Sequence, residues 1–134
     1  MTARMEASLV LFNDTLRAFS RVIVPEKLVQ FHKAVCLQVL TGVVIRTPVD
    51  TGRARGGWQL DIGGPRQSEE DRRDRAGSET ITKESANLQG LKFGQVVAIS
   101  NNVDYIEYLE EGSSQQAPQG MVAVTLTQVG AQFR

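Results

Sequence analysis

The triplet Asp50-Thr51-Gly52 is the first group of residues in this sequence that could carry chemistry. An aspartic protease uses two such aspartates, which share one proton, and two copies of the chain could supply the pair. That catalytic aspartate lies in a loop between strands, whereas a long predicted helix precedes Asp50. We therefore interpret the triplet as a turn in which Asp50 accepts backbone N–H groups and Gly52 tolerates a positive φ. A protease remains the remote alternative.

A second group is the pair His32 and Cys36, which lie four residues apart and so share one face of a predicted helix. They could touch one metal ion, but two ligands do not make a site, and the chain has no other histidine or cysteine. We therefore expect a pair packed in the core or in an interface. A single cysteine also excludes an intrachain disulfide.

Three glutamates, Glu107, Glu110 and Glu111, form the third group, and no partner signature for acid–base catalysis accompanies them. A solvated or intersubunit face is the better interpretation. The sequence contains no phosphate-binding loop, Ser/His/Asp arrangement or dinucleotide fingerprint. The prediction is a protein without enzymatic activity, cofactor or metal.

The charges of the chain are balanced in total but not along its length. Residues 1–60 carry eight Lys/Arg and four Asp/Glu, whereas residues 101–134 carry one and four. A basic beginning and an acidic end could attract each other in a head-to-tail contact between identical subunits. Arg53 and Arg55 could meet phosphate or carboxylate groups, and an ion pair with Asp50 or across a subunit boundary is the favoured interpretation. The formal net charge of zero argues against a tight nucleic-acid binder, so a DNA-binding module is a remote alternative.

The helices and strands that we expect to position these residues form a single α+β domain over residues 1–134. Its long N-terminal helix packs on a small, mostly antiparallel sheet of three or four strands, with one or two short helices. Periodicity and turn residues predict helices at 3–20, from Pro25 to Thr47-Pro48, at 80–90 and at 105–109, and strands at 55–62, 94–100 and 121–126. Residues 66–79 hold many charges and no large apolar side chain, which predicts a flexible charged loop.

The predicted helix that begins at Pro25 is apolar around much of its circumference. One stripe runs through five positions, and neighbouring positions widen it: Leu28, Phe31, Val35, Val39, Val43, then Cys36, Leu37, Leu40 and Val44. Such a helix is packed on more than one side, and in a thin domain the second side is expected to meet another subunit. Uninterrupted apolar runs such as residues 43–45 are too short to span a bilayer, so no membrane partner is expected.

Two stretches resemble one known pattern. The first is TPVDTGRARGGWQ at residues 47–59, and the second is SNNVDYIEYLEEGSSQQAPQGMV at residues 100–122. In this order, after a long helix and with a charged spacer between them, they resemble the tail-completion (minor tail) proteins of long-tailed phages. Gly57 departs from that pattern, which often has a polar residue before the tryptophan.

The resemblance implies a structural virion protein that is assembled in the host cytoplasm. It implies a ring, commonly of six copies, at the head-proximal end of the tail, which terminates the tail tube and joins it to the head connector. The expected partners are other copies of the chain, the tail tube protein below and the connector or stopper protein above, with genomic DNA only passing through the lumen. A neck ring one layer higher is the alternative.

For the ring contact we expect the segment 104–119 to pack on the neighbouring subunit's turn at 47–58, because aromatic residues dominate interface energies. The arginine-rich loop at 66–75 is expected to face the lumen or the tube. The candidate interface residues are Asp50, Arg53, Arg55, Trp58, Tyr105, Tyr108, Leu109, Glu110, Gln116 and Pro118.

Overall fold

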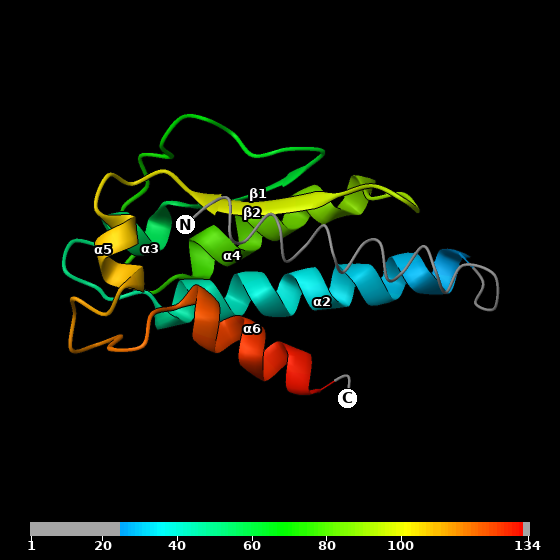
Figure 1. The fold of residues 1–134 in the computed structure, drawn as a ribbon. Helices are drawn as coiled ribbons and strands as arrows, with labels where there is room; N and C mark the ends of the chain where they lie inside the picture. Colours follow the sequence, from blue (N-terminus) through cyan, green and yellow to red (C-terminus); the bar gives the residue numbers. More distant parts are fainter. Residues whose placement is uncertain (1–24, 133–134) are drawn as a thin grey trace.

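The computed structural model describes residues 25–132, and it has the predicted α+β architecture (Figure 1). The predicted helix at 3–20 lies outside the described residues. The elements are α2 (Pro25–Arg46), α3 (Arg53–Gly56), β1 (Trp58–Ile62), α4 (Ser78–Ser85), the 3-10 helix η1 (Ala86–Gly90), β2 (Val97–Asn101), α5 (Ile106–Glu110) and α6 (Val122–Ala131).

Helix α2 is the centre of the domain. It begins at Pro25, whose missing N–H costs nothing in a first turn. It ends before Pro48, as predicted, because the residue that precedes a proline avoids the α region. The Thr47 hydroxyl donates to the Val43 carbonyl at 2.6 Å and accepts the Trp58 indole N–H at 2.7 Å. The end of the helix is thereby fixed to the start of β1.

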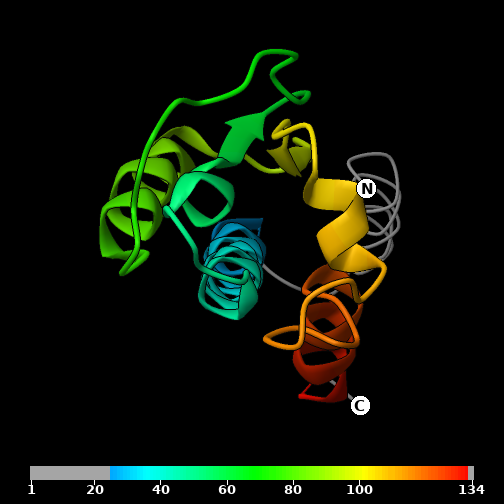
Figure 2. The same ribbon diagram turned by 90° about the vertical axis from the view of Figure 1, so that its left-hand side faces the viewer.

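The sheet has two antiparallel strands, with Leu60 opposite Ile99. The sheet and α4 lie on one side of α2, and α6 lies on another side (Figures 1 and 2). The core between these layers contains fully buried apolar side chains from α2 and both strands: Val39, Leu40, Val43, Trp58, Leu60, Val97 and Ile99. The prediction of three or four strands is wrong for the described residues.

The predicted strand at 121–126 is in fact the beginning of helix α6. Its β-branched residues suggested a strand, but Val122, Thr125 and Val129 recur at helical spacing and turn one face toward the core. Thr125 lies against Gly42 of α2, where an added Cβ would be 2.5 Å from the threonine methyl group. Tertiary packing of α6 on α2 therefore outweighs local β-propensity. The predicted strand at 55–62 likewise starts later, because residues 53–56 form α3.

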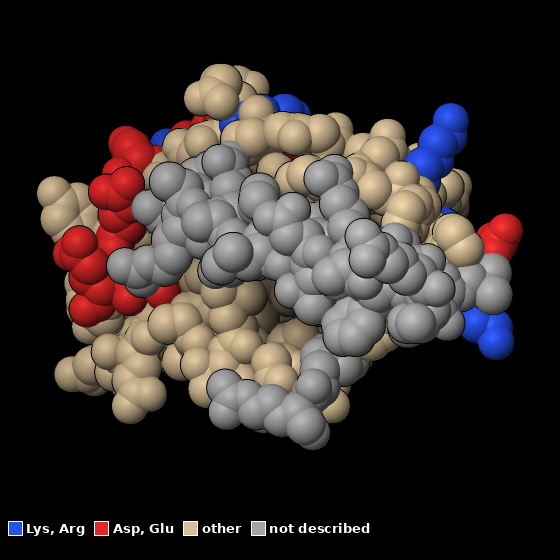
Figure 3. Space-filling model, turned by 45° about the vertical axis from the view of Figure 1, so that its right-hand side comes forward, with Lys and Arg blue, Asp and Glu red and all other residues tan. Residues whose placement is uncertain are grey.

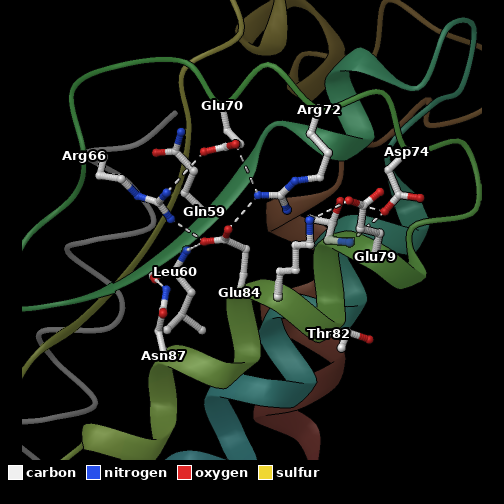
Figure 4. Close-up of polar contacts among 12 residues, drawn as sticks. Gln59, Leu60, Arg66, Glu70, Arg72, Asp74, Glu79, Thr82, Glu84 and Asn87 are labelled. Carbon is white, nitrogen blue, oxygen red and sulfur yellow. Dashed lines mark hydrogen bonds and ion pairs between the residues drawn. The ribbon is translucent and has the colours of Figure 1, made fainter.

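We predicted a flexible charged loop at 66–79, but its last two residues begin α4, and residues 66–77 lie against β1 and α4. Glu84 of α4 is the anchor: its carboxylate accepts the Leu60 N–H at 2.9 Å and an Arg72 guanidinium N–H at 2.7 Å (Figure 4). Arg66 donates to the same carboxylate and to Asp61. Buried ion pairs thus order a segment that has few apolar side chains.

Replacing Glu84 with alanine should lower the free energy of unfolding by about 3 kcal/mol, because two guanidiniums would lose a shared, buried carboxylate. Urea unfolding measures this change. The control is Glu79→Ala on the same helix, since Glu79 is exposed and pairs with the exposed Lys83 one turn away. Its effect should stay within about 0.5 kcal/mol. Equal effects of the two substitutions would contradict the anchoring role of Glu84.

Asp74 fixes the start of α4 and makes the fold sensitive to acid. Its carboxylate accepts the Gly77 N–H at 2.9 Å and both the N–H and the hydroxyl of Thr80 at 2.7 Å. Burial alone would raise the pKa of Asp74, but these hydrogen bonds outweigh it and hold the pKa below its usual value.

Because the pKa of Asp74 is lower in the folded state, the ionised carboxylate stabilises the fold above the unfolded pKa of about 4, and this contribution is lost as the pH falls through the folded value. Asp74→Asn should therefore cost about 1–2 kcal/mol at pH 7, and the difference from wild type should shrink steadily below pH 4. Thermal unfolding across pH measures it. A difference that is constant over this range would contradict the assignment.

Candidate functional site

The two stretches that resemble tail-completion proteins meet at one end of the molecule, which faces the viewer in Figure 2. The Gln116 side chain pairs with the backbone of Val49, accepting its N–H at 3.0 Å and donating to its carbonyl at 3.3 Å. A hollow of about 160 Å³ lies between the turn at 48–54 and residues of α5 and the following loop. We call the contact between these two stretches, together with the hollow beside it, the junction. The contact predicted between neighbouring subunits is therefore made within one chain.

Arg53 is the charged centre of the junction. It makes a two-pronged hydrogen bond to Glu69, at 2.8 and 2.7 Å, and lies 3.6 Å from a carboxylate oxygen of Asp104. Its guanidinium also lies 5.4 Å from the centre of the Tyr105 ring. The hydrogen bond to Glu69 raises the pKa of Arg53 and lowers that of Glu69. Both groups therefore stay charged. Arg53 connects three segments, and its ion-pair partners are Glu69 and Asp104 instead of the predicted Asp50.

Arg55 has a different role, because its hydrogen bonds go to neutral carbonyl groups. It donates to the carbonyl oxygens of Thr47 at 2.9 Å, Ile45 at 3.0 Å and Arg75 at 2.8 Å. Two of these carbonyls belong to the C-terminal end of α2, which carries partial negative charge. Burial lowers the pKa of Arg55. Within residues 25–132 the structure gives this cation no ion-paired carboxylate.

Asp50 is exposed, and the turn is held by its neighbours instead of by its carboxylate. The Thr51 hydroxyl accepts the Arg53 N–H at 3.3 Å, so the backbone N–H that we predicted Asp50 to accept goes to Thr51 instead. Gly52 has the predicted positive φ, 89°, and its carbonyl accepts the N–H groups of Gly56 and Asp74. The turn therefore has a structural role, and no second aspartate faces Asp50 within the described chain.

Trp58 and Glu110 are structural residues, although we predicted both at an interface. Trp58 is fully buried. The Glu110 carboxylate accepts the N–H groups of Met121, Val122 and Ala123 at 2.8 to 3.1 Å. These donors begin α6, where orphan N–H groups and the helix dipole favour a negative charge. Neither side chain is available to a neighbouring subunit.

The remaining candidates divide by exposure. Tyr108 is 66% exposed and Pro118 is exposed, whereas Tyr105 and Leu109 are half-buried against the core. Acidic side chains gather at the end of the molecule that carries α5 (Figure 3). Of the predicted set, Tyr108 and Pro118 are therefore the apolar residues that a partner can reach most easily.

The pair His32 and Cys36 is buried, as predicted. Burial raises the pKa of the Cys36 thiol to about 12 and lowers the pKa of His32. A thiol with this pKa is a poor nucleophile and a poor ligand. Among the described residues no group of three His, Cys, Asp or Glu side chains is arranged to hold a metal ion.

Sequence reasoning missed the most consequential polar residues. Glu84 and Arg72 are twelve positions apart and belong to no motif, so no sequence signal links them. Asn101 donates to the Ala54 carbonyl at 2.8 Å and accepts the Val103 N–H at 3.0 Å, which connects β2 to α3. This residue lies inside the second stretch, where its role in a turn was foreseeable.

Comparison of the chain with protein-family models, with curated proteins and with solved structures gave no match. The resemblance to tail-completion proteins therefore stays a prediction.

By length and composition alone, α2 is long and apolar enough to cross a membrane, although its uninterrupted apolar runs are short. However, half of its most apolar stretch is buried inside the domain, against the sheet, α4 and α6. We therefore interpret α2 as the core helix of a folded domain.

Glu110→Ala should lower the free energy of unfolding by about 2–3 kcal/mol, because three backbone N–H groups at the start of α6 would lose their acceptor. Chemical denaturation measures the change. Glu111→Ala is the matched control, since the neighbouring Glu111 is exposed, and it should change stability by less than about 0.5 kcal/mol. If the two variants unfold at the same denaturant concentration, the capping assignment is wrong.

Proposed function

We propose that this chain is a structural subunit of a tailed-phage virion that forms a closed ring of six copies at the head-proximal end of the tail. The ring terminates the tail tube and joins it to the head connector, and genomic DNA only passes through its lumen. Support comes from the two stretches described above and from a surface of the domain that suits self-association.

That surface is the exposed side of α2 together with the neighbouring α6, and we call it the open face. Leu37 is 42% exposed and Ile45 is 52% exposed on α2. No charged residue occurs in α2 between Lys33 and Arg46, and none occurs in α6. Protein surfaces in contact with water usually intersperse charges among apolar side chains, whereas interface centres are depleted in charge.

The open face is also grooved. A hollow of about 380 Å³ lies between α2 and α6. It is lined by Leu37, Thr41, Ile45 and Val129, by glutamines and by Arg46. An apolar groove of this kind, in which Arg46 is the charged lining residue, excludes water well when another protein surface fills it. Among the described residues, this partly exposed face, without charge in α2 between Lys33 and Arg46, is the observation that carries the proposal.

A ring requires that a patch on one side of the subunit meets a different patch on its neighbour, so that the contact repeats and closes. The uneven charge along the chain is compatible with such a contact. A neck ring one layer higher would use the same kind of surface and is the alternative proposal. Neither role needs a catalytic group.

Leu37→Lys should break the assembly, since it places a charge in the middle of the open face, where desolvation is costly. The expected result is a shift from a ring to a 14.7 kDa monomer with an unchanged circular dichroism spectrum. Light scattering coupled to gel filtration measures the mass. The control is Phe93→Lys, the same kind of change at an exposed aromatic residue before β2, which should leave the ring intact. A ring that survives Leu37→Lys would contradict the role of the open face.

The position in the virion is tested by a phage that lacks this protein. A terminator defect should give free heads together with tail tubes of uncontrolled length, and the labelled protein should restore joining and mark the head-proximal tail tip in electron micrographs. Tails of normal length that fail to join would support the neck ring instead. Fully infectious particles without the protein would contradict both roles.

A further inference from the structure

Helix α5 presents the most exposed large apolar side chain described in this chain. Tyr108 is 66% exposed. Its helical neighbour Glu111, three positions later, lies on the same face and is exposed, as are Glu107 and the preceding Asp104. The carboxylate of Asp104 is 79% exposed although it pairs with Arg53. We call Tyr108 and these three acids the knob.

A second hollow, of about 400 Å³, lies beside the C-terminal end of α2 and has the opposite character. Its apolar lining includes Ile45, Ala117, Pro118 and Val124, and its charged groups are Arg46 and Arg55. No knob residue takes part in it. We call it the receptor hollow, and through Ile45 it continues into the open face.

The two arginines of the receptor hollow donate their hydrogen bonds to neutral acceptors, and Asp74 acts on Arg55 through its charge without an ion-pair contact. Arg46 donates to the hydroxyl of Thr125 and to the side-chain carbonyl of Gln128. Arg55 donates only to backbone carbonyls among the described residues. Carboxylates brought to these guanidiniums would form charge-assisted hydrogen bonds, which are stronger than those to neutral acceptors.

We propose that the receptor hollow binds the knob of a second copy of this chain: Tyr108 enters the apolar space, and the acids around it face Arg46 and Arg55. The inference rests on the proposed function and names its intersubunit contact. Charge complementarity selects this occupant, because an aromatic side chain ringed by acids meets an apolar space ringed by arginines.

This contact differs from the one expected from the sequence. The segment 104–119 packs on the turn at 47–58 of its own chain, which leaves Tyr108 pointing outward from the junction. Since knob and receptor hollow share no residue, one subunit can offer its knob while it receives another. Such an interface is heterologous and propagates head to tail until the ring closes.

The test uses two variants that each disable one half of the contact. Tyr108→Ala removes the knob at an exposed position. Val124→Glu fills the receptor hollow with a carboxylate that repels the knob's acids; it lies in the first turn of α6, where a negative charge suits the helix. Each variant alone should remain monomeric where the wild type assembles, with wild-type circular dichroism and thermal unfolding. Phe93→Ala, an exposed aromatic outside both surfaces, is the control and should assemble.

Mixing the two variants is the decisive step. The intact knob of the Val124→Glu chain should bind the intact hollow of the Tyr108→Ala chain, so sedimentation should show a 1:1 pair that grows no further. A mixture that sediments as two unrelated monomers would overturn the inference, as would either variant assembling like the wild type. If the wild type itself stays monomeric, the proposed function fails as well, so the two failures are distinguishable.

Discussion

The structure depends on one constraint: a 22-residue helix that is apolar on most sides must be covered by a small number of short elements. The two-stranded sheet and α4 cover one side of α2, and α6 covers another. The described residues supply no further layer for the side that carries Leu37 and Ile45. Exposed apolar area of this kind costs free energy in water, and burying it against another copy removes that cost. The shape of the monomer thus favours association.

Three charged side chains connect segments that lie apart along the chain. Glu84 receives two arginines and holds the segment 66–77, and Glu110 fixes the start of α6. Arg53 joins the turn after α2 to Glu69 and to the residues that precede α5. Each carboxylate or guanidinium bonds several groups at once, which suits a site where a single unpaired charge would be costly. As a result, the end that carries the junction presents its surface side chains on an ordered framework.

Local patterns in the sequence were sufficient for the elements whose own residues decide them. The long helix, two of the strands, the short helix near 80–90 and the helical turn before Gly112 are all present. The missed features depend on contacts between distant positions. Helix α6 has β-branched residues and is helical because it packs on Gly42, and the charged segment is ordered by a glutamate outside it. The two stretches were expected to meet across a subunit boundary, whereas in the structure they meet within one chain. Sequence cannot say whether a contact lies within or between chains.

The most direct test of the account is the mass of the purified chain measured by native mass spectrometry over a wide range of concentration. A chain that covers its open face with other copies should give one dominant closed species, a fixed multiple of 14.7 kDa, six-fold for the proposed ring. A species of 14.7 kDa alone at every concentration would show that the exposed side of α2 needs no partner, and would contradict the account.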